Sequence, residues 1–518
     1  MKNFKRTIVI GCSLAALAGC GGDEIVSPGT SGDIIINNPA PTPTPTPTPT
    51  GSTGVVAAAG CPTINSTGGL TDAGTITGPT GTYRVCELPA VIDTNDTLPY
   101  IAGLLYSLPG RVDVGTDRGA TSTGTSVTLG MEAGVMVFGG TGRSFLVVNR
   151  GNKINAVGTA TRPIVFTSRD NVLGLSTDSS IGQWGGVVLL GRAPVSDCRL
   201  GGFNRGGVNS DTGAPFNQAG CEQELEGANT VTLFGGTDSA DSSGTMKYFQ
   251  IRYSGFSLAP GKELQSLTTG GIGSGTTIDH FQSFNSSDDG MEFFGGSVNM
   301  KYVVAVGADD DSFDVDTGAK ANLQYVIGAQ RTNGGDNLIE LDSPDGDFST
   351  AALPQTVLQV ANFTFIERST ANSQVVRARG GAKLVLANGV IDTDNETCIR
   401  IDETVTLSAD PDFYSIQADC DPASAFRGDA GVTNAQVQGQ WDAGSNNNAA
   451  ATITLTSLFY TTTVPAFDPK TLSSYFDTTT FIGAVSSAND SWYHNWTCNS
   501  ATLDLGSSTG ACTTLPVY

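Results

Sequence analysis

Acidic side chains recur at matching places in a series of short apolar segments in the middle of the chain. Three such segments are Asp289-Gly-Met-Glu-Phe-Phe, Asp311-Ser-Phe-Asp-Val-Asp and Asp336-Asn-Leu-Ile-Glu-Leu, which begin roughly 22 to 25 residues apart. Alternate side chains of a strand face opposite ways, so Met291 and Phe293 share one side while Glu292 and Phe294 share the other. In the second segment Phe313 and Val315 match the inward side and Asp314 and Asp316 face out. In the third segment, after a shift of one residue, Ile339 and Leu341 face in and Glu340 and Asp342 face out. The chemistry that this pattern could support is cation binding or acid–base catalysis.

If these segments stack on one another, their carboxylates form two columns. The first column is expected to hold Glu292, Asp314 and Glu340, and the second to hold Asp289, Asp311 and Asp336, with Asp288, Asp309 and Asp310 close by. Like charges about 4.8 Å apart repel, so such a stack needs cations, raised pKa values or good hydration. Oxygen ligands suit hard cations, and the sequence therefore predicts a Ca²⁺ site at Asp288, Asp289, Glu292, Asp311, Asp314, Asp336 and Glu340. Solvated turns capped by Asp and Asn are the alternative.

A catalytic interpretation rests on Asp289, Asp310 and Asp311. Ser287-Asp-Asp-Gly and the later Asp309-Asp-Asp-Ser resemble the Asn-Thr-Asp-Gly and Gly-Asp-Asp-Cys motifs of pectin-cleaving glycosidases on β-helices, with Asp310 about 21 residues, close to one coil, after Asp289. That resemblance implies an acid and a base on either side of a glycosidic bond. The Gly-His-Gly and Arg-Ile-Lys elements of those enzymes have no convincing match here, which weakens the hydrolase interpretation.

Basic residues offer little further chemistry. A lyase variant would need Ca²⁺ and a basic proton abstractor, and the nearby Arg377 and Arg379 are expected instead to be salt partners of the acidic columns. His280 stands where neighbouring repeats carry tyrosine, so it is expected to belong to a stack of rings. Those tyrosines are Tyr248, Tyr302 and Tyr325. No phosphate loop, nucleophile elbow or zinc motif occurs, and no organic cofactor is expected.

The elements that would position these residues are short strands in a repeat. Four further segments align, namely Thr245-Met-Lys-Tyr-Phe-Gln-Ile, Thr277-Ile-Asp-His-Phe-Gln-Ser, Asn299-Met-Lys-Tyr-Val-Val-Ala and Asn322-Leu-Gln-Tyr-Val-Ile-Gly. Apolar strands separated by Gly, Asn and Asp turns at this period predict the coils of a parallel β-helix, with three strands and three turns per coil. A propeller blade needs about 40–45 residues, roughly twice this period.

Several segments resemble a family of exported bacterial proteins of right-handed parallel β-helix type, with a pectate-lyase-like scaffold and no assigned activity. They include Trp184-Gly-Gly-Val-Val-Leu-Leu-Gly, Phe234-Gly-Gly-Thr-Asp, Asp288-Asp-Gly-Met-Glu-Phe-Phe-Gly-Gly and Phe481-Ile-Gly-Ala-Val. The expected fold is all-β, a right-handed parallel β-helix over 116–425. Because open ends of a β-helix must be covered, caps are expected over 61–115 and 426–518.

Cysteines indicate an oxidising compartment. Eight follow the leader, and they fall into neighbouring couples that are expected to form disulfides. The couples are Cys61 with Cys86, Cys198 with Cys221, Cys398 with Cys420, and Cys498 with Cys512.

The first residues resemble a bacterial lipoprotein leader. A basic start, a short apolar run and Leu17-Ala-Gly-Cys20 predict a signal peptide over 1–19 and lipidation of Cys20. Gly21 after the cysteine favours the outer membrane by enterobacterial sorting rules. Residues 20–60 include a strict Pro-Thr alternation from Pro41 to Thr50, which predicts an extended tether.

The balance of charge excludes one class of partner. The chain has 27 basic and 50 acidic residues, which argues against a nucleic-acid surface. The sequence favours an outer-membrane lipoprotein that contacts glycans or another envelope protein through the side of its β-helix. The alternative is a polysaccharide hydrolase or lyase that uses Asp289, Asp310 and Asp311.

Overall fold

The structure is a computed structural model of the chain. It describes residues 54–121, 124–140, 142–196, 221–225, 230–257, 263–342, 354–369, 374–394 and 396–518. Two units are distinguished, Met1–Ser52 and Thr53–Tyr518, and every described residue belongs to the second. The predicted signal peptide, Cys20 and most of the predicted tether therefore lie outside the described residues.

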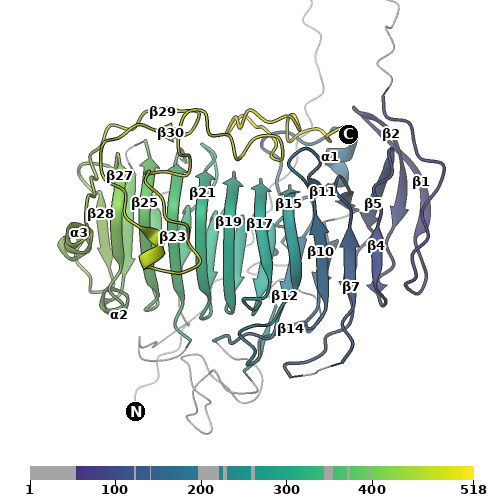
Figure 1. The fold of residues 1–518 in the computed structure, drawn as a ribbon, viewed down its shortest axis with the longest axis horizontal. Coiled ribbons are helices and arrows are strands. Elements are labelled where there is room, and N and C mark those ends of the chain that lie inside the picture. The colour runs from purple at the N-terminus through teal and green to yellow at the C-terminus, as the bar shows by residue number, and fades with distance from the viewer. Residues whose placement is uncertain are drawn as a thin grey trace, which may run out of the picture. The chain divides into compact units, whose positions relative to one another are not determined.

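Two long sheets of mainly parallel strands build the second unit (Figure 1). In the described part of the chain the larger sheet has 15 strands and the smaller has 11. Each strand pairs with its counterparts one coil before and one coil after, as β17 does with β15 and β19. The prediction of an all-β parallel β-helix is confirmed.

The larger sheet contains β1 (Thr71–Gly78), β2 (Gly81–Glu87), β4 (Asp96–Leu98), β5 (Leu104–Leu108), β7 (Thr128–Met131), β8 (Met136–Gly139), β10 (Lys153–Val157), β11 (Ile164–Ser168), β15 (Gly244–Arg252), β17 (Thr277–Phe284), β19 (Ser297–Val306), β21 (Lys320–Ala329), β23 (Val357–Ile366), β25 (Lys383–Asp392) and β27 (Asp412–Ala418). The smaller sheet contains β3 (Val91–Ile92), β6 (Arg111–Val114), β9 (Phe145–Val148), β12 (Gly186–Leu190), β16 (Leu267–Gly270), β18 (Met291–Phe294), β20 (Phe313–Asp316), β22 (Ile339–Leu341), β24 (Gln374–Ala378), β26 (Thr397–Asp402) and β28 (Phe426–Asp429). The remaining elements are β13 (Gln223–Glu224), β14 (Leu233–Phe234), β29 (Leu455–Thr456), β30 (Phe459–Tyr460), α1 (Arg169–Leu173), α2 (Thr404–Ser408), α3 (Asn434–Ala443) and the 3₁₀ helix η1 (Pro469–Thr471).

The larger sheet turns a corner in every coil. In the first coils this corner is a loop between two short strands, such as 158–163 between β10 and β11. From β15 onward one strand spans both walls, pairing with β10 and with β11, and it bends at Tyr248, whose φ is 50°. Two of the three expected strands thus become one bent strand. We call the matching residues with positive φ the corner column: Tyr248, His280, Tyr302, Tyr325, Asn362, Asn388 and Ser415.

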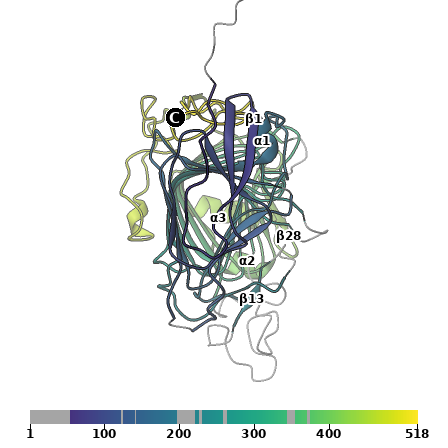
Figure 2. The ribbon, with the colours of Figure 1, turned by 90° about the vertical axis from the view of Figure 1, so that its right-hand side faces the viewer.

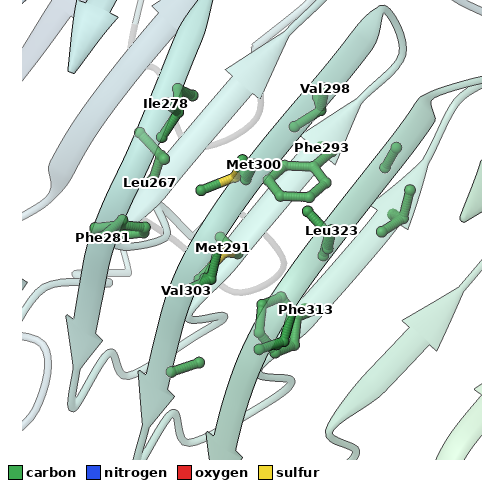
Figure 3. Close-up of a cluster of buried hydrophobic side chains, with 14 of the residues drawn as sticks. Leu267, Ile278, Phe281, Met291, Phe293, Val298, Met300, Val303, Phe313 and Leu323 are labelled. Atoms are coloured by element: carbon green, nitrogen blue, oxygen red, sulfur yellow. The ribbon is translucent and has the colours of Figure 1, made fainter. Parts of the chain in front are cut away.

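Figure 2 views the coils end-on. Apolar side chains from both sheets fill the inside of the coil (Figure 3). Met291, Phe293 and Phe313 of the smaller sheet face Met300 and Leu323 of the larger, and all five are fully buried. Strand alternation then places the residues between them, Glu292 and Asp314 among them, on the outer face. The apolar pattern therefore fixes where the acidic side chains point.

The N-terminal region expected to be a cap over 61–115 already contains coils. β2 pairs in parallel with β5, and β3 with β6, so coiling begins near Gly81. Only β1 departs from the parallel order, since it lies antiparallel to β2 at the edge of the sheet. This strand covers the open edge, as a β-helix end requires.

The region expected to be a C-terminal cap over 426–518 has two roles. The helix α3 covers the last coil, where Trp441 contacts Phe413 and Phe426 with ring centroids 5.6 and 5.4 Å apart. Residues 445–518, which we call the strap, run back along the side of the coils towards the first ones (Figure 1). The strap follows the corner column because that column presents rings and amides that need partners.

Side-chain amides hold the strap in place. Gln282 donates to the carbonyl of Cys498 at 3.0 Å and accepts its N–H at 2.8 Å. Gln324 makes the same pair of bonds with Asp477, and Asn388 with Phe467. These bonds imitate the ladder of a further strand and so satisfy the backbone of an irregular segment.

The disulfides follow the predicted neighbour pairing wherever both cysteines are described. Cys61–Cys86, Cys398–Cys420 and Cys498–Cys512 are bonded. Cys221 is also disulfide-bonded, and its predicted partner Cys198 lies outside the described residues.

Candidate functional site

The first acidic column lies on the outer face of the smaller sheet, in the predicted register. Glu292 pairs with Asp314, and Asp314 pairs with Glu340, on β18, β20 and β22. The same row continues into Arg377 on β24 and Arg400 on β26. Three carboxylates therefore stack along one line and are followed by guanidinium groups.

The second acidic column differs from the prediction by one residue. The backbone N–H of Asp311 donates to Asp289 Oδ1 at 3.0 Å, and that of Asn337 donates to Asp311 Oδ1 at 2.6 Å. Asn337, and not Asp336, thus takes the third place, while Asp336 lies level with Asp310. The segment after Asp336 carries one more residue before its inward-facing strand, a shift that the prediction applied to the first column but not to the second.

These columns are largely removed from solvent. Asp289, Glu292, Asp311 and Glu340 are 5%, 6%, 3% and 8% exposed, whereas Asp310 is exposed. Asp314 Oδ1 is buried and has no hydrogen-bond partner. A buried carboxylate oxygen without a donor is costly, so the position requires a proton or a cation.

The pKa values follow from this burial and from the neighbouring charges. Burial, together with the charge of Asp288, raises the pKa of Asp289 well above its usual range. Burial also raises the pKa of Asp311 and of Asp314, with further contributions led by Glu340 and Asp316 respectively. Desolvation and then Asp336 raise the pKa of Asp310 to about 6. Raised pKa values mean that these carboxyl groups favour binding a proton, or a cation in its place, over standing together as free charges.

Three groups of carboxylates lie close enough to share a cation. Each group has one oxygen per residue, and these oxygens lie within 4.8 Å of one another. The groups are Asp288, Asp289 and Asp310; Asp289, Glu292 and Asp314; and Asp310, Asp311 and Asp336. Ca²⁺ binds oxygens at about 2.3–2.6 Å, so ligands on opposite sides of it are about 5 Å apart. The clustered carboxylates could hold a metal ion.

Glu340 is paired with two arginines. Arg379 Nη2 lies 3.0 Å from Glu340 Oε1, and Arg377 Nη1 lies 3.4 Å from the same oxygen. Arg377 and Arg379 also reach Asp402 and Asp342, each at 3.0 Å. The two arginines are thus salt partners of the acidic columns, as their sequence positions suggested, and they neutralise one end of the face.

The catalytic candidates occupy two environments. Asp289 and Asp311 are buried and accept backbone N–H groups, which leaves little room for a polymer to reach them. Asp310 is exposed and belongs to two of the three carboxylate groups, one that contains Asp289 and one that contains Asp311. Asn337, which the sequence did not single out, touches Asp311, Asp336 and Glu340 through its amide. Its position could have been found by aligning inward-facing apolar residues.

His280 belongs to a stack of rings. Its ring centroid lies 4.1 Å from that of Tyr248 and 4.4 Å from that of Tyr302, and Tyr325 follows at 4.8 Å. Trp496 of the strap packs edge-on against His280 at 5.5 Å. The position of His280 in a stacking ladder is confirmed, away from the acidic columns on the opposite sheet.

Comparison with known proteins places the chain in a family. No helix among the described residues is long and apolar enough to cross a membrane. No curated protein and no solved structure matches the chain. The family model described as a pectate-lyase-like beta helix domain matches residues 115–497, which include both acidic columns, the corner column and most of the strap. The chain belongs to the family of pectate-lyase-like beta helix domains.

Proposed function

We propose that this protein is a lipid-anchored envelope protein whose β-helix binds a glycan or another envelope protein through the acidic face of the smaller sheet. The supporting observation is the stacking of Glu292, Asp314 and Glu340 beside the second column. A fold made by repetition has no need for like charges in register, since Thr268 precedes Glu292 in the same row without a charge. Retention of such a costly arrangement is typical of functional sites.

Calcium is the cation that the donor set fits best. The groups offer only oxygen ligands, from several carboxylates within 4.8 Å. Asp289, Glu292 and Asp314 form the most enclosed group, and the partnerless Oδ1 of Asp314 supports a ligand there. A bound Ca²⁺ would offset the repulsion within the column and could bridge to hydroxyl or carboxylate groups of a partner.

The anchor is the part of the proposal that rests on sequence. Lipidation of Cys20 would fix the protein to the outer membrane, and the Pro-Thr segment would act as a spacer. Replacing Cys20 with Ser should abolish acyl labelling and release the protein from the membrane fraction. A variant that stays with membranes as the wild type does would remove the anchor from the proposal.

A polysaccharide-cleaving activity is the second candidate. The observation that favours it is exposed Asp310, with a pKa raised to about 6, beside Asp311 and Asp336. A carboxyl that titrates near neutrality can serve as a general acid. Burial of Asp289 and Asp311 speaks against it, and so does the absence of a histidine in the neighbouring Gly334-Gly335-Asp336 segment.

One experiment separates these functions. The purified protein is screened against acidic and neutral polysaccharides with Ca²⁺ and with chelator, and both binding and reducing-end release are measured. We expect Ca²⁺ to raise the melting temperature and to promote binding without product. The double variant Asp289→Asn/Asp314→Asn should lose both effects, whereas Asp442→Asn, at an exposed position of α3, should keep them.

Two results would change the assignment. If Ca²⁺ alters neither melting nor binding, the columns hold protons in place of a cation and the metal site is wrong. If reducing ends appear and Asp310→Asn abolishes them, the protein is an enzyme and the binding proposal falls.

A further inference from the structure

A hollow lies on the corner of the first coils, where loops stand in place of the corner column. It has a volume of about 570 Å³ and adjoins a second hollow of about 340 Å³. Tyr100, Arg162, Tyr518, Thr161 and Thr509 line the first. Val55, Val56, Ile101 and Met136 line the second, and Tyr100 and Tyr518 are among the residues that line both.

Arg162 has unmet hydrogen-bonding capacity in this hollow. Its Nε and Nη2 are buried without a partner, and its side chain forms no ion pair with the described residues. The nearby Glu132 accepts the backbone N–H of Tyr100 at 2.9 Å. Arg118, Arg192 and Arg252 also have a buried guanidinium nitrogen without a hydrogen-bond partner, but of these four arginines Arg162 alone lies over a tyrosine ring and lines this hollow. A buried guanidinium is normally paired.

The walls around Arg162 are held firmly. Its Cζ lies 3.9 Å from the ring centroid of Tyr100 and 6.0 Å from that of Tyr518. Tyr518 donates its hydroxyl to the carbonyl of Pro163 at 2.9 Å, and Tyr100 donates to the carbonyl of Tyr518 at 3.3 Å. A Cβ at Gly134 would stand 3.0 Å from Arg162 Nε, so glycine leaves room for the guanidinium. The cation is therefore held in place before any ligand arrives.

The adjoining hollow is apolar and open. Val56 and Val517 are 80% and 61% exposed, and both line it. They are two of the five large hydrophobic side chains that stand exposed among the described residues. An exposed apolar patch beside a polar group marks a binding site more often than a bare surface.

We propose that this corner hollow binds an apolar carboxylate, with the carboxylate at Arg162 and the apolar body against Val56, Ile101 and Met136. Nε and Nη2 are enclosed, so Nη1 is the guanidinium nitrogen that can reach a ligand, and its N–H and the positive charge favour a carboxylate over a neutral group. The apolar wall disfavours a fully hydroxylated sugar acid. Two sources share this chemistry, a free organic acid and the C-terminal residue of a peptide. The site is separate from the acidic face and needs no metal.

The test uses the full chain, kept in solution by detergent. The affinity of each probe is measured by isothermal titration calorimetry, with chelator present so that no metal contributes to binding. The probes are N-acetyl-phenylalanine, its amide, glucuronate, and one hexapeptide ending in Phe with either a free or an amidated C-terminus. We expect the two free carboxylates with apolar bodies to bind, and the amides and glucuronate to bind at least about tenfold more weakly. Tighter binding of the hexapeptide than of the small acid identifies a peptide as the source, and equal binding identifies a free acid.

Variants decide whether Arg162 is responsible. Arg162→Gln should weaken carboxylate binding by about tenfold or more, while Arg169→Gln, at an exposed arginine of α1, should leave it unchanged. Val56→Ser should weaken the binding of both the acid and its amide. Because Val56 is exposed, this substitution should leave the fold intact. Equal binding of acid and amide, equal binding by Arg162→Gln, or no binding of either acid at millimolar concentration each overturns the proposal. Asp314→Asn should not affect this binding, so failure of the acidic-face proposal is recognised separately.

Discussion

The acidic face and the strap-covered corner are both products of the same repetition, with opposite energetic consequences. On the smaller sheet, coil-to-coil register stacks Glu292, Asp314 and Glu340, which repel one another. On the larger sheet, the same register stacks Tyr248, His280, Tyr302 and Tyr325, whose rings attract. A β-helix multiplies whatever its repeat carries, so an unfavourable column that is retained indicates a task other than folding.

The two regions also differ in what covers them. The strap closes the corner column with rings and with amide-to-backbone bonds. The acidic face instead meets Arg377 and Arg379 at the end where Glu340 lies. We therefore expect substitutions in the corner to destabilise the fold and substitutions of the acidic residues to stabilise it when no cation is present.

The largest expected effect is that of Trp496→Ala in the strap. Trp496 is fully buried, packs against Tyr248 and His280, and donates its indole N–H to the carbonyl of Trp492. Loss of a buried tryptophan should reduce the free energy of unfolding by about 3–5 kcal/mol, as measured by denaturant titration. Partial release of the strap should also appear as faster proteolysis after residue 445. An effect below about 1 kcal/mol would show that the strap is only loosely attached.

The next effect is that of Gln282→Glu, which keeps the shape of the side chain. The carboxylate can still accept the N–H of Cys498, but it cannot donate to its carbonyl, 3.0 Å from the amide nitrogen. Because two buried acceptors then face each other, the free energy of unfolding, measured in urea, should fall by about 1–3 kcal/mol. The matched control is Gln436→Glu in the exposed capping box of α3, where the new carboxylate still accepts the Thr433 N–H and should change stability by less than about 0.5 kcal/mol.

The sequence specified the repeat and its register better than it specified the ends. Segments that start at Thr245, Thr277, Asn299 and Asn322 align residue for residue in the structure, because inward-facing apolar side chains allow one register only. Asp336 was misplaced by one residue because its coil carries an extra residue before the strand. The strap was invisible to pattern analysis, since its contacts are made by single amides and rings that lie far away in sequence.

The site was predictable in outline and not in detail. The alternation of inward and outward side chains along each strand predicted the outward row of Glu292, Asp314 and Glu340. The sequence also suggested that two arginines pair with this row. It could not give the depth of burial, which depends on segments folded over the sheet, nor the role of Asn337. The hollow at Arg162 had no sequence signal, because its walls come from Tyr100 and Tyr518, at opposite ends of the described chain.

The third effect concerns pH, and for the acidic face it has the opposite sign to that expected of an ordinary hydrogen-bonded carboxylate. Carboxyls whose pKa is raised by folding, as for Asp289, Asp310, Asp311 and Asp314, bind protons more tightly in the folded state. Their stabilising contribution is full below the unfolded pKa of about 3.9 and is lost as the pH rises through the folded pKa. In chelator, the free energy of unfolding should therefore fall from pH 5 to pH 8, by about 1.4 kcal/mol for every tenfold gain in proton affinity on folding.

Asp314→Asn should flatten this decline, and saturating Ca²⁺ should abolish it in the wild type. Asp96 provides the contrast. Burial acts to raise the pKa of Asp96, but hydrogen bonds from Ser66 and Asn65 outweigh it and lower this pKa. The contribution of Asp96 to the free energy of unfolding is therefore present at pH 5 and is lost only below about pH 4. A stability that rises between pH 5 and pH 8 in chelator would contradict the assignment of raised pKa values to the acidic face.

The smallest effect is expected from His280→Tyr in the corner column. The substitution gives this coil the ring that Tyr248, Tyr302 and Tyr325 already carry at positive φ, between 50° and 60°, so the backbone imposes no new strain. It exchanges an imidazole paired with Asp279 for a larger ring in the stack. These terms oppose each other, and the net change in the free energy of unfolding should stay within about 1 kcal/mol. Because a catalytic imidazole cannot be replaced by a phenol, unchanged glycan binding and unchanged melting in this variant would confirm that the ring serves the stack, whereas loss of glycan binding would move the functional surface from the acidic face to the corner.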